Sequence, residues 1–147
     1  MLRISSKSRY AIRIMVYLAS QAPSLVPARK QDIADSEQIS ADYVEQILIR
    51  LRGGGLVVSH RGARGGFTLA REAHLIRVLD VLEAAEGPLG FVPDDEAGSV
   101  HPTIAVSSRL WSGLQKTLES ELAKVSIADM AADVAKLQQG AQLMYDI

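Results

Sequence analysis

One stretch of this sequence decides its fold: KQDIADSEQISADYVEQILIRLRGGGLVVSHRGARGGFTLAR, residues 30–71. Apolar residues at helical spacing predict a short helix over residues 30–37 and a second helix that begins after Ser40. Ser40 is a favourable N-cap, and the triple glycine at residues 53–55 ends the second helix. Two short amphipathic helices with a few residues between them are typical of a helix-turn-helix.

The second half of the stretch predicts a β-hairpin. Residues 56–58 and 67–69 are rich in apolar and β-branched side chains, so each is expected to form a strand. The segment RGARGG, residues 61–66, lies between them, and its glycines permit a tight connection. This hairpin is expected to be a wing with Arg61 and Arg64 at its tip.

The helix-turn-helix and wing are flanked by further predicted helices. Residues 6–21 carry apolar side chains at helical spacing, with a serine available as N-cap, and residues 75–86 repeat this pattern. Residues 90–102 are polar and rich in Pro, Gly and Asp, which favours a mobile loop.

A long helix is predicted over residues 103–125, followed by a last helix capped by Ser126. Its apolar residues follow a three-four spacing that forms a heptad-like seam, which Leu110 widens. We expect this seam to pair two copies of the chain through Ile104, Trp111, Leu114, Leu118 and Val125. Trp111 could instead line an effector pocket between the long helix and the winged region.

The predicted fold class is mainly α, a winged helix-turn-helix with a two-stranded β wing and a long C-terminal dimerisation helix. Three parts are expected. Residues 1–71 form the DNA-binding domain, residues 72–102 a connecting helix and flexible loop, and residues 103–147 the dimerisation helix and the C-terminal helix.

Composition excludes several kinds of chemistry. None of the 147 residues is cysteine, which rules out disulfides, cysteine-held iron–sulfur clusters and a cysteine nucleophile. The three histidines are scattered, so no metal site and no cofactor are expected. The chain also lacks a catalytic constellation, so we do not expect an enzyme. The acidic loop with His101 could hold a hard metal ion, but its spacing selects no geometry.

The remaining composition points to a protein of the cytoplasm. No apolar run approaches the length of a membrane span, and the basic, polar N-terminus does not resemble a signal peptide. Charge is divided unevenly along the chain. Residues 1–71 carry 11 Lys or Arg against 5 Asp or Glu, whereas residues 72–147 carry 5 against 12. The basic first half fits a polyanionic partner such as DNA.

The recognition helix and the wing offer side chains suited to reading DNA. In a helix-turn-helix the second helix enters the major groove. Gln46 can pair with adenine, Arg50 can read guanine or bind phosphate, and Glu45 can accept from cytosine. The wing arginines can bind phosphate or enter the minor groove. The residues expected to contact DNA are Lys7, Arg9, Ser40, Tyr43, Glu45, Gln46, Arg50, Arg61 and Arg64.

Four segments together resemble the Rrf-two family of bacterial regulators, of the IscR/NsrR/CymR type. They are SKSRYA at residues 6–11, ISADYVEQIL at 39–48, GLV at 55–57 and RGARGGFTLA at 61–70. The similarity continues through residues 78–89 and covers almost the whole chain. The resemblance implies a homodimer that represses genes from a palindromic operator, with a winged helix and a long dimerisation helix in each subunit.

This sequence departs from the family in two ways. Many members carry three cysteines in the loop after the fourth helix, where they bind an iron–sulfur cluster, but residues 90–102 contain none. Cluster sensing and thiol-based sensing are therefore not expected here. The second departure is Gln38, which stands where the family turn commonly has glycine. If this position is left-handed, glutamine costs about 1 kcal/mol there.

Three alternatives remain open at this stage. A protein partner could control the regulator by docking on the acidic second half. A small-molecule effector could do so beside Trp111. The chain could also be an interaction module that no longer binds DNA.

Overall fold

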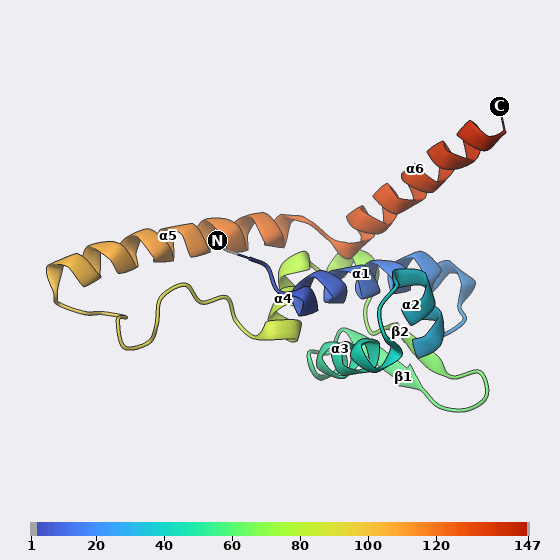
Figure 1. Ribbon diagram of the computed structural model, residues 1–147, viewed down its shortest axis with the longest axis horizontal. Helices are drawn as coiled ribbons and strands as arrows, with labels where there is room; N and C mark the ends of the chain where they lie inside the picture. Colours follow the sequence, from blue (N-terminus) through green and yellow to red (C-terminus); the bar gives the residue numbers. More distant parts are fainter. Residues whose placement is uncertain (1–2, 147) are drawn as a thin grey trace.

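The computed structural model describes residues 3–146, and within them the chain is mainly helical with one two-stranded sheet (Figure 1). This confirms the predicted fold class. The main elements in chain order are α1 (Ser6–Gln21), α2 (Lys30–Glu37), α3 (Ala41–Gly53), β1 (Val57–His60), β2 (Gly66–Leu69), α4 (Val78–Glu86), α5 (Pro102–Lys124) and α6 (Ile127–Tyr145). None of the described helices is long and apolar enough to cross a membrane.

Helix α1 is the centre of the core. Ile14 and Met15 on its buried face are fully enclosed, and α1 packs against α3, α4 and the start of α6. Helix α3 contributes Ile47 and Leu51 to the same core. Burying such side chains stabilises the fold by about 1.5–3 kcal/mol each. Helix α3 therefore shares one rigid packing unit with α1 and α4.

The turn between α2 and α3 has the left-handed residue that the sequence suggested. Gln38 has φ 55° and ψ 46°, and its backbone N–H donates to the Ala34 carbonyl. Ile39 then enters the core and is 8% exposed. A side chain with a β-carbon costs about 1 kcal/mol in this conformation. Burial of Ile39 offsets that cost and fixes the direction in which α3 leaves the turn.

The wing is an antiparallel hairpin in which Val57 lies opposite Leu69 and His60 opposite Gly66. Its strands run slightly closer to the tip than the sequence pattern predicted, at residues 57–60 and 66–69. Ala28, in the chain that leads to α2, pairs with Phe67 through two backbone hydrogen bonds of 3.0 and 2.8 Å. A β-carbon at Gly66 would lie 2.5 Å from the Ala28 carbonyl oxygen, so this close approach requires glycine.

Helix α4 begins later than the apolar pattern predicted. Residues Ala73–Leu75 form a short 3₁₀ helix, and the backbone N–H of Arg77 donates to Asp80 Oδ2 at 2.8 Å. The first turn of α4 is therefore capped at Arg77 rather than at Leu75. Helix α4 then ends at Gly87, whose φ of 94° favours glycine.

Helices α5 and α6 extend away from the core in opposite directions (Figure 1). The start of α6 is fixed to the segment before α4. Ile127 N–H donates to the Ile76 carbonyl and Val78 N–H to the Val125 carbonyl, each at 2.9 Å. In contrast, α5 has no buried residue. A helix of 23 residues with exposed apolar side chains is expected to pack against something else.

Candidate nucleic-acid interface

The start of the recognition helix α3 is capped as its sequence predicts. Ser40 Oγ accepts a hydrogen bond from the Tyr43 backbone N–H at 3.3 Å. The Ser40 hydroxyl is exposed at the positive end of the helix dipole, where a phosphate is favoured. The cap thus fixes where α3 begins and leaves its first turn open to solvent.

Gln46 has the environment expected of a base-reading residue. It is exposed on α3, and its amide makes no hydrogen bond to the described part of the chain. The preceding residue, Glu45, is engaged differently, because its Oε2 lies 2.8 Å from Lys30 Nζ on α2. This hydrogen bond is the main cause that raises the pKa of Lys30. Glu45 therefore links α3 to α2, and its carboxylate would have to release Lys30 before it could contact a base.

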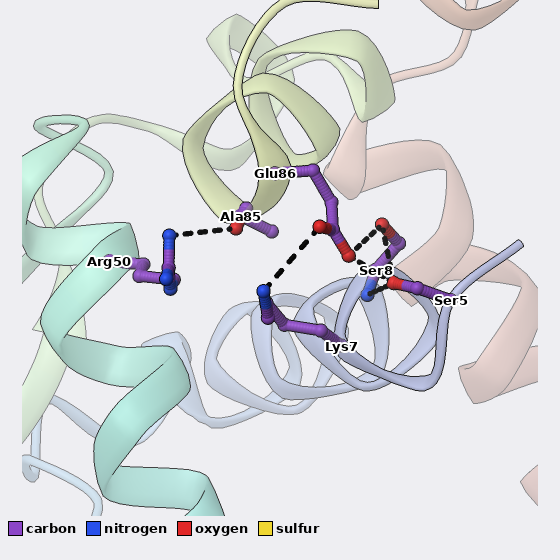
Figure 2. A network of polar contacts seen from close by, with 6 residues as sticks. All are labelled: Ser5, Lys7, Ser8, Arg50, Ala85 and Glu86. Atoms are coloured by element: carbon purple, nitrogen blue, oxygen red, sulfur yellow. Dashed lines mark hydrogen bonds and ion pairs between the residues drawn. The ribbon is translucent and has the colours of Figure 1, made fainter.

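The Arg50 side chain points toward helix α4, whereas Gln46 is exposed to solvent. Its Nη1 donates to the Ala85 carbonyl in the last turn of α4 at 3.4 Å (Figure 2). Exposed carbonyls at a helix C-terminus carry partial negative charge, which favours a guanidinium there. In this arrangement Arg50 ties the recognition helix to α4.

A second contact joins the end of α4 to the start of α1. Glu86 accepts hydrogen bonds from the hydroxyls of Ser5 and Ser8, and its Oε2 lies 3.5 Å from Lys7 Nζ (Figure 2). The hydrogen bond from Ser5, with the charge of Lys7 as a further cause, lowers the pKa of Glu86. Lys7 is thus paired within the chain, on α1, and not grouped with the residues of α3.

The two remaining candidates near α1 pack on aromatic rings. Tyr43 lies edge-on to Tyr10, with ring centroids 5.7 Å apart, and is half-buried. The Arg9 guanidinium lies 6.0 Å from the Tyr10 centroid and is exposed. Tyr43 therefore helps to orient α3 against α1, while Arg9 remains accessible to an anion.

The wing presents Arg61 and Arg64 to solvent. Both are exposed, and neither forms an ion pair among the described residues. The tip is held from the side by Arg29, whose Nη2 donates to the Ala63 carbonyl at 3.1 Å. Gly65 is tightly enclosed, since a β-carbon there would collide with the His60 carbonyl oxygen. The wing arginines therefore project from a well-supported turn.

Helix α3 and the wing lie next to one another on the side of the molecule away from α5 and α6 (Figure 1). The fold thus brings α3, which carries Gln46, next to the wing, which carries Arg61 and Arg64. Lys7 and Arg50 instead reach the end of α4 (Figure 2). Arg29 and Lys30, which precede and begin α2, were missed from the sequence. Their position at the start of the first helix of the pair, near a predicted wing, could have indicated that they contact the wing and the second helix.

The seam predicted for α5 is only partly exposed. Trp111, Leu114 and Val125 are exposed at 39%, 47% and 40%, whereas Ile104 and Leu118 are half-buried toward their own chain. Trp111 Nε1 donates to Ser107 Oγ at 3.1 Å. The exposed face is completed by Val106 and Leu110, at 64% and 57%, of which Val106 was missed from the sequence.

These features define the chain as a winged helix-turn-helix protein of the DNA-binding class. A family profile described as "Rrf2: Iron-dependent Transcriptional regulator" matches residues 4–133, and the chain belongs to this Rrf2 family. It is a transcriptional regulator by family, and the expected resemblance is confirmed.

Relatives and solved structures agree with this assignment. The chain is 38% identical over 133 residues to an HTH-type transcriptional regulator assigned in Mycobacterium tuberculosis, covering 88% of this chain and 81% of the relative. Its fold is similar to that of CymR, the global cysteine regulator of B. subtilis, with TM-score 0.74, 32% identity and coverage of 90% and 98% of the two chains. The fold is also similar to that of T. potens IscR, with TM-score 0.75 and 34% identity. That comparison covers 93% of this chain and 91% of the IscR chain.

The iron dependence in the family description does not fit the donors of this chain. The sequence has no cysteine. Within residues 3–146, no three His, Asp or Glu side chains lie close enough to hold a metal ion together. A cluster held by thiolates cannot form without cysteine ligands.

Proposed function

We propose that this protein is a sequence-specific DNA-binding regulator whose recognition helix α3 enters the major groove while the wing binds the backbone or minor groove. The observation that carries the proposal is the placement of Gln46, Arg61 and Arg64. All three are exposed, without a side-chain hydrogen bond or ion pair to the described residues, and the elements that carry them, α3 and the wing, lie next to one another (Figure 1). In the proposal, Gln46 reads a base, Arg61 and Arg64 bind phosphates, and Arg9 and Ser40 add backbone contacts.

The proposed assembly is a homodimer formed through α5. An exposed face carrying Val106, Leu110 and Leu114 on a helix without buried residues supports it, because such a face is stabilised by packing against a second copy. Of the residues predicted for this seam, Trp111, Leu114 and Val125 are placed to contribute, with Ile104 and Leu118 behind them. Two-fold pairing would present two recognition helices to half-sites of a palindrome.

We further propose that the protein acts in the cytoplasm and represses its target genes, as the family resemblance suggests. The division into a DNA-binding part (residues 1–71), a connecting part (72–102) and a dimerisation part (103–147) belongs to the same proposal. Ile127 is a point of contact between the parts, because it is fully buried in the core formed mainly by the first two.

The proposal is tested by capturing bound genomic DNA and then measuring binding of purified protein to the recovered fragments by electrophoretic shift. Specific retardation by the protein alone, with a two-fold symmetric footprint, is the expected result. If retardation needs an added protein or metabolite, control by a partner or effector is favoured. Absence of retarded fragments at low salt, together with capture of a partner protein, would contradict DNA binding and favour the interaction module.

A further inference from the structure

A hollow of about 290 Å³, lined by both apolar and polar residues, lies between the loop after α4 and one face of α5. Its loop side includes Glu96 and Ser99, and its helix side includes Ser108, Arg109 and Ser112. This face is distinct from the apolar face with Val106 and Leu110, which lines a different hollow. The volume lies near the lower limit for drug-sized ligands, so it suits a small metabolite.

The hollow contains a polar group with no partner. Ser108 Oγ is shielded from solvent and makes no hydrogen bond to the described chain. A serine in a helix can bond to a carbonyl of the preceding turn, and Thr117 on α5 does so with the Gly113 carbonyl at 3.0 Å. Ser108 does not, and a shielded hydroxyl without a partner is unfavourable. A ligand that hydrogen-bonds to it would remove that penalty.

Two opposite charges line the same hollow without pairing. Neither Glu96 nor Arg109 has an oppositely charged atom within 4.0 Å among the described residues, so they do not pair with each other. A molecule that carries both charges can lie between them. A simple anion such as phosphate would be repelled by Glu96, and a neutral sugar would leave both charges unused.

We propose that this hollow binds a free α-amino acid, with the ligand carboxylate on Arg109, its ammonium group on Glu96 and a hydrogen bond to Ser108. Arg109 suits a carboxylate because its guanidinium offers two parallel N–H donors. The serine hydroxyls of the hollow favour a ligand with a small polar side chain. Any effect of the ligand on DNA binding rests on the proposed function, whereas ligand binding itself does not.

The loop wall of the hollow is attached weakly to α5. Its turns are local, with Glu96 and Ala97 N–H both bonding to the Pro93 carbonyl at 3.0 and 3.2 Å. Away from the junction at His101, one bond among the described residues, from Phe91 N–H to Gln115 Oε1 at 3.2 Å, joins the loop to α5. A ligand that bridges Glu96 and Arg109 would therefore order this loop on the helix.

The test is calorimetric titration of the full-length protein, without DNA, with each proteinogenic amino acid separately. Binding of at least one is expected, together with a higher Tm. The same titration with the des-amino acid and with the decarboxylated amine of the ligand should show at least tenfold weaker binding. No binding by any amino acid, or equal binding by the des-amino analogue, would overturn the proposal.

Two variants test whether the ligand binds in the hollow. Ser108→Ala should weaken binding about tenfold, the loss of one hydrogen bond, and yet raise the Tm of the unliganded protein. Arg109→Gln should weaken binding at least tenfold, and Lys116→Gln, an exposed cation of α5 outside the hollow, serves as the matched control. If both Ser108→Ala and Arg109→Gln bind the ligand with wild-type affinity, the ligand binds elsewhere and the proposed site is refuted. A separate shift assay with operator DNA then shows whether the ligand changes DNA affinity, so failure of DNA binding is distinguished from failure of the ligand site.

Discussion

Replacing both wing arginines should weaken DNA binding in a way that depends strongly on salt. Arg61 and Arg64 are exposed and unpaired within the described residues, so their charges are available to phosphates. In the proposed dimer the double variant Arg61→Ala/Arg64→Ala loses four such charges. Each phosphate contact contributes about 0.9 to the slope of log affinity against log salt, so the slope should become shallower by about 3.6.

The slope converts to a measurable change in affinity. Between about 50 and 200 mM salt, wild-type protein should lose about 150-fold more affinity than the double variant if all four contacts are made. The assay is fluorescence anisotropy with a random-sequence duplex over this salt range, which needs no knowledge of the operator. Because phosphate contacts carry no base information, the same change is expected with every duplex.

A matched control separates local contact from net charge. Lys116→Ala/Lys124→Ala removes the same number of charges from exposed positions of α5, away from the wing. For this control, the slope of log affinity against log salt should differ from wild type by less than about one unit, which is the contribution of a single phosphate contact. If the wing variant and this control show the same slope as wild type, the wing does not touch the backbone and the reasoning fails.

Three further predictions follow from the described contacts. Gln46→Ala should reduce discrimination at an adenine by about 1–3 kcal/mol while leaving affinity for random DNA unchanged, as read by selection from a degenerate duplex pool; unchanged selected sequences would count against base reading. Leu110→Asp/Leu114→Asp should convert a dimer to a monomer in light scattering, whereas Leu143→Asp, at a more exposed leucine of α6, should not; a dimeric double variant would contradict pairing through this face. Glu86→Gln should lower the free energy of unfolding by about 1 kcal/mol at neutral pH. Because the pKa of Glu86 is lowered, its contribution is present above the ordinary glutamate value of about 4.3 and is lost as the pH falls below it; denaturant melts should therefore converge in acid, and a constant difference at all pH values would exclude this cause.

Local signals in the sequence were sufficient for most of the fold. The N-cap Ser40, the glycines that end α3, and the apolar spacing of α1 act within a few residues, so they were readable without tertiary information. The start of α4 was less predictable. Leu75 continues the apolar pattern, but a cap at Arg77 determines where the helix begins.

The functional surface was less predictable because its side chains are distributed by contacts between distant segments. Arg50 was predicted to contact DNA from its place on the second helix of the pair, and nothing in the sequence pattern indicated that it reaches the end of α4, 35 positions further along the chain. Glu45 likewise pairs with Lys30 across the turn. Periodicity alone also could not tell that Ile104 and Leu118 are half-buried within their own chain, and their part in a dimer stays a prediction.

Burial separates the part of the molecule proposed to read DNA from the part proposed to bind a ligand. Residues 87–125 contain no buried side chain, whereas α1, α3 and α4 share a core with fully enclosed residues. Moving the loop therefore costs little, and reshaping α3 within its core costs much. The two regions meet at the end of α4, where Glu86 holds α1 and the Ala85 carbonyl holds Arg50 of α3 (Figure 2). It follows that a ligand at the loop would act on the spacing and tilt of two intact recognition helices in the proposed dimer and not on the shape of either helix.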